Sequence, residues 1–343
     1  MLERVTLACH GGGKAGLDDF EAARTRCGSF PQALGVRRCL PRPRGSTDVL
    51  AGYRVVRRIG GGGTGSVYAA RDEYGADVAL KVVANDAAAY GREVRALQAL
   101  QHRNIVQMVD TQGGQEGKGP YLIVMELAEW GSLAGVVLRS AEAAAYVAEV
   151  ASALQFIHER GYAHGDVKPG NILRFADGTV KLCDFGCCER PEAAAETRGR
   201  PRGTPAFMPP EAFQGTGSGW TAAVDSWGLA ATSFCLVRGR PPFSVAGRGL
   251  FDSILYGRAN LTACQGERGN DADDEADLAN FVAWGLTKAP RGRPSMEQVL
   301  QHPWLTKAAA LQHSDCSLAR GCSSPGRQEP EGGSSPASSS QTC

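Results

Sequence analysis

The sequence has no long hydrophobic run and no excess of charge of either sign. Its longest apolar stretches, such as Tyr121–Met125, are far shorter than the roughly 20 residues that a membrane-spanning helix needs. Lys and Arg number 37 and Asp and Glu number 36, which leaves a net charge of +1. We therefore expect no membrane span and no nucleic-acid partner. A chain with so little net charge has no general electrostatic attraction to nucleic acid or to a membrane surface.

Metal-binding and disulfide patterns are also missing. The 11 cysteines include no CxxC pair, and the adjacent Cys187 and Cys188 have no histidine at metal-ligand spacing. An odd number of scattered cysteines gives no disulfide framework. The first residues lack the basic-then-apolar order of a secretory signal. We therefore expect reduced thiols and a cytoplasmic protein.

Composition divides the 343 residues into three regions. Residues 1–52 mix Gly, Arg and Pro without sustained periodicity, and residues 306–343 are rich in Ser, Gly and Pro. We expect both extensions to be disordered, because they have little to bury. Residues 53–305 form the globular block between them, and its acidic run at 271–277 is expected to be a solvated loop.

Hydrophobic periodicity changes along the globular block from strand-like to helical. Strands are expected at 53–56, 66–70, 77–83 and 121–125, where β-branched and aromatic residues gather. Helices are expected at 88–101, 141–160, 209–213, 222–237, 248–257, 275–287 and 295–301, where apolar residues recur at helical spacing.

One short polar run, His164–Asn171, carries the clearest chemical signal. It places an Asp, a Lys two residues later and an Asn five residues later on one loop. Phosphoryl transfer from ATP needs these residue types: Asp166 can accept a hydroxyl proton, Lys168 can neutralise the moving phosphoryl group, and Asn171 can hold Mg²⁺. Asp184 follows thirteen residues later and can be a second ligand for the metal.

A glycine-rich run, Gly60–Val67, lies between two expected strands. Glycines let the backbone approach phosphates closely, although four glycines in a row could equally form a flexible hairpin tip. Lys81 ends an apolar strand sixteen residues after Gly65, and Glu93 follows on the next expected helix. A Lys81–Glu93 pair would hold the lysine against phosphates, whereas the alternative is a surface lysine and a solvated helix face.

Taken together, residues 53–305 resemble a eukaryotic protein kinase domain. The resemblance implies an α+β, two-lobed fold, with a small β-rich N-lobe at 53–127 and a larger helical C-lobe at 128–305. It covers nearly the whole globular block. The motifs that carry it occur in order: Gly60–Val67, Lys81, Glu93, His102–Val106, Met125–Leu127, His164–Asn171, Asp184–Gly186, Met208–Glu211, Asp225–Gly228, Arg293–Pro294 and His302–Trp304.

The resemblance implies an ATP and Mg²⁺ site between the lobes. The catalytic residues would be Asp166, Lys168, Lys81 and Glu93, and the metal ligands Asn171 and Asp184. Met125 would guard the back of the pocket, and Glu126–Ala128 would form the hinge against adenine. The nucleotide would be bound by Ile59, Gly60, Gly61, Gly62, Gly63, Thr64, Gly65, Val67, Ala79, Lys81, Glu126, Ala128 and Leu173.

Further residues are assigned to substrate and support roles by the same resemblance. Lys168 and Thr204 are similar to those of serine/threonine kinases, so the expected partners are protein substrates with Ser or Thr acceptors. Glu211 and Arg293 would form a buried ion pair, and Asp225 would cap the catalytic loop. A hydrophobic column of Leu97, Met108, His164 and Phe185 would join the lobes. Oligomeric state is not predicted.

The chain departs from the family pattern at Gly165, where an Arg is expected. That Arg pairs with a phosphate on the activation segment, so a phosphate at Thr197 would lose a main charge partner. We expect activity that depends little on phosphorylation there. The spelling His-Gly-Asp-Val-Lys resembles members of the MAP kinase kinase kinase group.

Two other functions remain open from the residues. A pseudokinase, which binds ATP or partners without catalysis, should lack at least one of Lys81, Asp166, Asn171 and Asp184, and all are present. A small-molecule phosphotransferase would usually lack the Thr204–Glu211 segment that this chain has. The favoured hypothesis is an active serine/threonine protein kinase in intracellular signalling.

Overall fold

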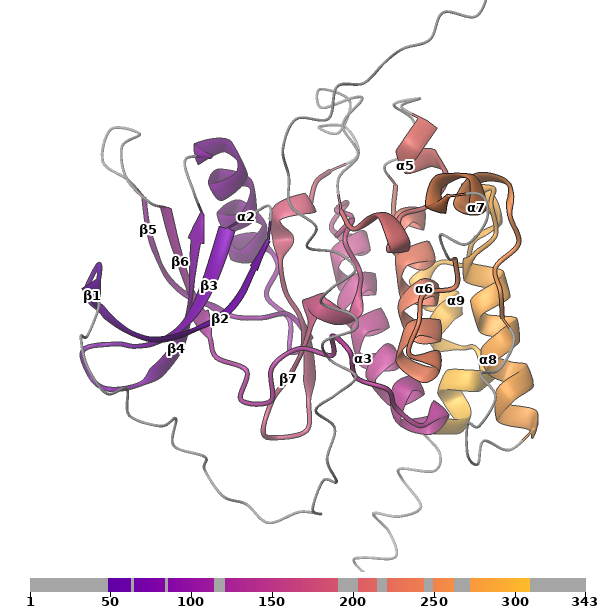
Figure 1. Cartoon of the computed structure of the whole chain (residues 1–343), viewed down its shortest axis with the longest axis horizontal. Helices are drawn as coiled ribbons and strands as arrows, with labels where there is room; N and C mark the ends of the chain where they lie inside the picture. Colours follow the sequence, from indigo (N-terminus) through magenta and orange to yellow (C-terminus); the bar gives the residue numbers. More distant parts are fainter. Residues whose placement is uncertain are drawn as a thin grey trace, which may run out of the picture.

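The computed structural model describes residues 49–62, 65–83, 86–113, 121–190, 203–214, 221–243, 249–261 and 272–308. An antiparallel sheet with one helix beside it forms the N-lobe, and a larger group of helices forms the C-lobe (Figure 1). The predicted α+β, two-lobed fold is confirmed.

The N-lobe is built on a six-stranded sheet of order β1-β2-β3-β4-β6-β5. Its elements are β1 (Val49–Leu50), β2 (Tyr53–Gly62), β3 (Gly65–Arg71), β4 (Asp77–Val83), α2 (Ala87–Ala99), β5 (Met108–Gln112) and β6 (Tyr121–Glu126). The central strands β4 and β6 are almost wholly buried, which explains their continuous apolar sequences. The strands predicted at 53–56, 66–70, 77–83 and 121–125 are confirmed.

The sheet curls until its two edges approach each other. The hydroxyl of Tyr53 on β2 donates to Oδ2 of Asp110 on β5 at 3.1 Å, and the Gln112 amide donates to the Ala51 carbonyl at 3.3 Å. These bonds join elements that are not neighbours in the sheet, so the curvature is held by side chains as well as by strand twist.

The C-lobe begins after the hinge that follows β6. Its helices are α3 (Ser140–Glu159), α5 (Glu211–Gln214), α6 (Ala223–Arg238), α7 (Leu250–Tyr256), α8 (Ala272–Gly285) and α9 (Met296–Leu300). The C-lobe also has a two-stranded sheet of β7 (Ile172–Arg174) and β8 (Val180–Leu182), and Leu182 forms a bridge with Ile105 in the segment between α2 and β5. Short 3-10 helices complete it: η3 (Pro169–Asn171), η4 (Phe185–Cys187), η5 (Pro205–Phe207) and η6 (Pro290–Gly292).

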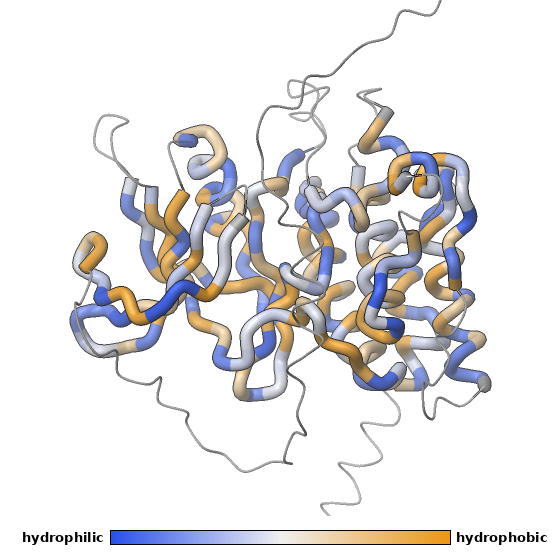
Figure 2. Tube along the Cα trace, in the orientation of Figure 1, coloured by the Kyte–Doolittle hydropathy of each residue, from blue (hydrophilic) through white to orange (hydrophobic). Residues whose placement is uncertain are grey.

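The core of the C-lobe forms around α6. Every residue of that helix from Val224 to Arg238 is buried, so it lies inside the lobe rather than on its surface. Helix α3 packs a stripe of small and branched residues, including Ala144, Val147 and Leu154, into the same core. Figure 2 shows hydrophobic residues as orange segments running through both lobes. The predicted helices are confirmed, with ends that differ by a few residues.

Three expectations need correction. The N-terminal extension was predicted to run to residue 52, but Val49 and Leu50 pair with Arg54 and Tyr53 because a tight turn lets β1 fold back on β2. The predicted C-terminal tail begins too early, since 306–308 are helical. The rest of both extensions lies outside the described residues.

The acidic run at 271–277 was predicted to be a loop, but α8 begins at Ala272. Asp273, Asp274 and Glu275 occupy the first turn of this helix, where carboxylates interact favourably with the N-terminal end of the helix dipole. Strands β5, β7 and β8 were not predicted, because such short strands carry little periodicity. No helix among the described residues is both long and apolar enough to cross a membrane.

Candidate active site

The motif residues converge on one large cavity between the lobes, with a volume of about 1350 Å³. The glycine-rich hairpin and β4 line its upper side, and the His164–Asn171 loop, β7 and the Asp184 turn line its lower side. Of the predicted residues, the cavity is lined by Ile59, Gly60, Gly61, Gly65, Val67, Ala79, Lys81, Glu93, Glu126, Ala128, Asp166, Lys168, Asn171, Leu173 and Asp184. Gly62 ends β2, while Gly63 and Thr64 lie outside the described residues.

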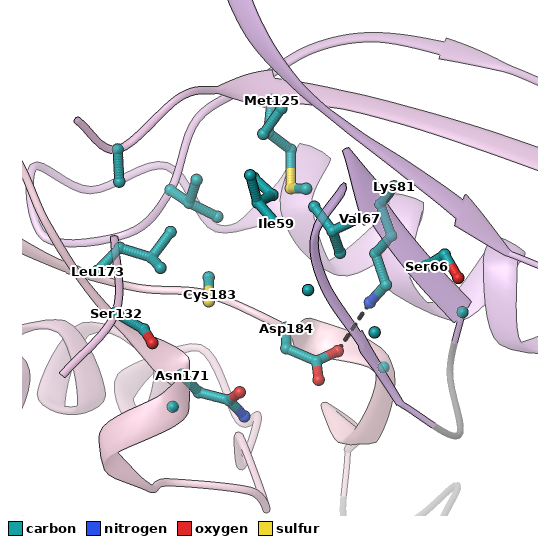
Figure 3. A pocket seen from close by; sticks show the side chains of 18 of the residues that line it. Ile59, Ser66, Val67, Lys81, Met125, Ser132, Asn171, Leu173, Cys183 and Asp184 are labelled. Atoms are coloured by element: carbon teal, nitrogen blue, oxygen red, sulfur yellow. Dashed lines mark hydrogen bonds and ion pairs between the residues drawn. The ribbon is translucent and has the colours of Figure 1, made fainter. Parts of the chain in front are cut away.

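Lys81 joins the two lobes through a buried charge cluster. Its Nζ lies 2.6 and 2.7 Å from the carboxylate oxygens of Glu93 and 2.8 Å from Oδ1 of Asp184. Figure 3 shows Lys81 reaching from the upper lobe toward Asp184 in the lower one. The predicted Lys81–Glu93 contact is therefore confirmed, and the solvent-exposed alternative is wrong.

Local structure explains why these three groups meet. Lys81 lies on β4, and Glu93 lies on the buried face of α2 with Ala96 and Leu97. Asp86 caps that helix by accepting from the Ala89 N–H at 2.8 Å, which fixes the start of α2 at Ala87.

Lys81 and Asp184 stabilise each other's charge in this cluster, whereas burial raises the pKa of Glu93. Burial disfavours the charge on Lys81, but the carboxylates of Asp184 and Glu93 outweigh it and raise the pKa of Lys81 above its ordinary value. Burial likewise opposes the charge on Asp184, yet Lys81 lowers the pKa of that carboxyl. The ammonium and the Asp184 carboxylate thus both stay charged at neutral pH.

The catalytic-loop motif forms a second polar cluster at the floor of the cavity. Lys168 Nζ donates to Oδ2 of Asp166 at 2.7 Å and to Oγ1 of Thr204 at 2.6 Å. The Thr204 N–H donates to Oδ1 of Asp166 at 2.8 Å. Asn171 donates to the Asp166 carbonyl at 2.8 Å and to its carboxylate at 3.1 Å. The predicted contacts of Thr204 with Asp166 and Lys168 are confirmed.

A buried carboxylate holds this loop from below. Asp225 on α6 accepts from the N–H groups of His164 and Gly165 at 2.8 and 2.7 Å, and its Oδ2 lies 2.8 Å from Nε2 of His158. Burial opposes the charge on Asp225, but these partners lower the pKa of its carboxyl. The predicted capping role of Asp225 is confirmed in its geometry.

The backbone conformation at position 165 favours glycine. Its φ is +81°, in the region where a side chain is strained. The approaching segment requires a second glycine: Gly203 has φ +100°, and a Cβ there would lie 2.9 Å from the Gly165 carbonyl oxygen. The loop therefore reaches its observed conformation without the strain that an Arg at position 165 would carry.

We expect Gly165→Ala to lower the free energy of unfolding by about 1–2 kcal/mol, the cost of a left-handed backbone for a residue with a Cβ. Gly113→Ala is the matched control, because its φ is not positive and an added Cβ would meet only Tyr90 at 3.9 Å. Urea denaturation of the two variants measures the difference. Equal stabilities would contradict the strain argument.

The end of the cavity where adenine was predicted to bind is lined by apolar side chains. Ile59, Val67 and Met125 lie on one side and Leu173 on the other (Figure 3). The residues of the predicted hydrophobic column, Leu97, Met108, His164 and Phe185, are buried or pack against one core. The His164 and Phe185 rings are in edge contact, with centroids 5.0 Å apart.

The predicted Glu211–Arg293 ion pair forms at the end of the Thr204–Glu211 segment. The guanidinium donates to both carboxylate oxygens at 2.6 and 2.8 Å. It also donates to the carbonyls of Ala223, Thr287 and Lys288. This pair fixes the end of the Thr204–Glu211 segment against α6.

Several lining residues were not predicted. Ser66, Ser132 and Cys183 are among the residues that line the cavity (Figure 3). Ser66 and Cys183 are each adjacent to a predicted residue, which was an available signal, while Ser132 had none. Burial raises the pKa of the Cys183 thiol, which disfavours the reactive thiolate form. Thr197 lies outside the described residues.

Comparison with known proteins gives a consistent result. Residues 53–305 match the family described as Protein kinase domain. The chain is 30% identical over 241 residues to Serine/threonine-protein kinase STK11 of Rattus norvegicus, which covers 68% of this chain and 53% of that protein. It is 31% identical over 278 residues to MAP3K epsilon protein kinase 1 of Arabidopsis thaliana, covering 76% and 19%.

A third relative is Serine/threonine-protein kinase shk1/pak1 of Schizosaccharomyces pombe, 30% identical over 271 residues, covering 76% of this chain and 39% of that protein. The chain thus spans about half the length of STK11 and less of the other two.

Proposed function

The chain belongs to the protein kinase domain family, and from this premise we propose that it transfers the γ-phosphate of ATP to Ser or Thr hydroxyls of protein substrates. The observation that carries the proposal is the connected set of charged groups in the cavity. Lys81 contacts both Glu93 and Asp184, and Lys168 contacts both Asp166 and Thr204. A pseudokinase, which only binds nucleotide or partners, would not need these contacts among the charged groups.

The cavity fits a magnesium nucleotide. Asn171 and Asp184 present amide and carboxylate oxygens, which suit Mg²⁺ when phosphates and water complete its coordination. Within the described residues no group of three or more His, Cys, Asp or Glu could hold a metal alone, as expected if the nucleotide supplies the remaining ligands. When bound, Mg²⁺ would neutralise charge on the phosphates.

In the proposed mechanism, the protein positions two reactants and stabilises charge. Lys81, held by Glu93, grips the phosphates beneath the glycine-rich hairpin. Asp166 orients the acceptor hydroxyl and takes its proton. Lys168 lies within hydrogen-bonding distance of Asp166 and neutralises charge on the phosphoryl group during transfer.

Thr204 supports the choice of a Ser or Thr acceptor. Its hydroxyl accepts from Lys168 and its N–H donates to Asp166, so the Thr204–Glu211 segment is hydrogen-bonded directly to the catalytic loop. Cys183, Cys188 and Cys235 are free thiols, which favours a reducing cytoplasmic setting and a role in intracellular signalling.

The test is incorporation of labelled phosphate from ATP into a generic basic protein by the wild type and by Asp166→Ala. We expect incorporation only with the wild type, and phosphoserine or phosphothreonine in the product. Equal, background-level incorporation would instead support a scaffold that binds nucleotide or partners without catalysis. A peptide library would then define the preferred acceptor sequence.

We further expect phosphatase treatment to leave the activity largely unchanged, because Gly165 offers no guanidinium to a phosphate on the activation segment. Mass spectrometry before and after treatment would verify that phosphate has been removed. Loss of activity on dephosphorylation, restored by rephosphorylation, would overturn this expectation.

A further inference from the structure

A bidentate ion pair ties the hinge to the C-lobe beside the adenine end of the cavity. Lys181 Nζ donates to Oε1 and Oε2 of Glu126 at 2.8 and 2.7 Å. The side chains are only 18% and 24% exposed, so water screens this pair less than an ordinary surface pair.

Both partners are held by additional contacts. The backbone N–H of Gln107 donates to Oε1 of Glu126 at 2.7 Å, and Lys181 Nζ lies 4.6 Å from the centroid of the Phe175 ring. Glu126 therefore connects the chain before β5, the end of β6 and strand β8. With so many contacts the two side chains have one well-defined arrangement.

Strand register shows what the pair connects. Glu126 lies opposite Val78 on β4, next to Ala79, which is above the adenine region. Lys181 lies directly opposite Leu173 in the β7–β8 hairpin, and Leu173 is below that region. The ion pair thus joins the strands that carry the upper and lower walls of the adenine site.

The spacing between those walls matters physically. A flat ring gains dispersion energy from both walls only at contact distance, and a gap of about 0.5–1 Å forfeits a quarter to a half of each contact. The walls belong to different lobes connected by a hinge, so a contact between the lobes is needed to hold that distance.

We propose that Lys181 is a positioning residue that holds Glu126 and thereby sets the spacing of the adenine site. The inference rests on the proposed nucleotide binding and adds a residue that does not touch the nucleotide.

The experiment measures binding of ADP and of adenosine to the full chain by calorimetry. Lys181→Met is expected to weaken both ligands by the same factor, about tenfold, because the lost contact acts on the ring rather than on the phosphates. Lys181→Arg should retain most of the affinity, since a guanidinium can also bond both carboxylate oxygens. Lys307→Met, which breaks an exposed pair with Asp277, is the matched control and should bind like the wild type.

A double-mutant cycle ties the effect to the pair. In a Glu126→Gln background, Lys181→Met should weaken ADP binding much less than it does in the wild type. In kinase assays the KM for ATP should rise, while kcat and the KM for a peptide substrate stay unchanged.

The outcomes separate the two proposals. If the wild type binds ADP and Lys181→Met binds it equally well, the positioning role is wrong and nucleotide binding stands. A rise in kcat in Lys181→Met, with no change in the KM for ATP, would also overturn it, because the pair would then restrain the lobes rather than position the ring. If the wild type binds neither ADP nor adenosine, the proposed function itself fails.

Discussion

Replacing Asp166 with Asn is expected to slow phosphoryl transfer by about two to four orders of magnitude, the usual contribution of a positioned acid–base group. Asn has the same shape, and its carbonyl oxygen can still accept from either Lys168 or the Thr204 N–H, but its NH2 group cannot accept from the other donor or take the hydroxyl proton. Because the shape and one of these bonds are kept, the domain should remain folded while the chemistry is lost.

Single-turnover measurements with saturating ATP isolate this step from nucleotide binding. The KM for ATP and the melting temperature should stay close to those of the wild type. Asp252→Asn, at an exposed position in the first turn of α7, is the control and should retain full activity. Wild-type rates in Asp166→Asn would remove Asp166 from the mechanism and favour another base.

Replacing Arg293 with Met is expected to lower the free energy of unfolding by about 3–5 kcal/mol, the cost of removing one partner of a buried ion pair. The loss leaves the Glu211 carboxylate uncompensated and removes the donor to three backbone carbonyls. A methionine of similar length still fills the space, so the effect reports the lost charge and hydrogen bonds.

Thermal unfolding should shift downward by about 2–4 °C for each kcal/mol in a domain of this size. The matched control is Arg71→Met, whose pair with Asp77 is 29% and 41% exposed and should contribute less than about 1 kcal/mol. Equal shifts in the two variants would show that burial of the Glu211–Arg293 pair has no special effect.

Much of the fold could be predicted because its long elements have clear periodicity. Strand β4 and helices α3 and α6 carry apolar patterns that tertiary packing did not override. Short elements were missed: β7 has three residues, and it forms because β8 lies opposite, which no local pattern reveals. The start of α8 was missed because an acidic run suits both a loop and a first helical turn.

The proximity of the catalytic-loop residues could also be predicted from the sequence. Asp166, Lys168 and Asn171 lie within six residues, so their proximity follows from chain connectivity. Lys81 and Asp184 are separated by 103 residues, and their 2.8 Å contact depends on how the lobes meet. Resemblance to the kinase family assigned both residues to one ATP and Mg²⁺ site in advance, but neither it nor composition and spacing predicted their direct contact.

The sequence by itself determined which chemical groups are present, their order, and the absence of an Arg at position 165. Only the tertiary structure decided that Gly165 adopts φ +81° above Asp225 and that Lys181 bonds Glu126. The physical reason is that both features join segments 55 or more residues apart, and the distance between such segments is set by packing of the core rather than by local conformation.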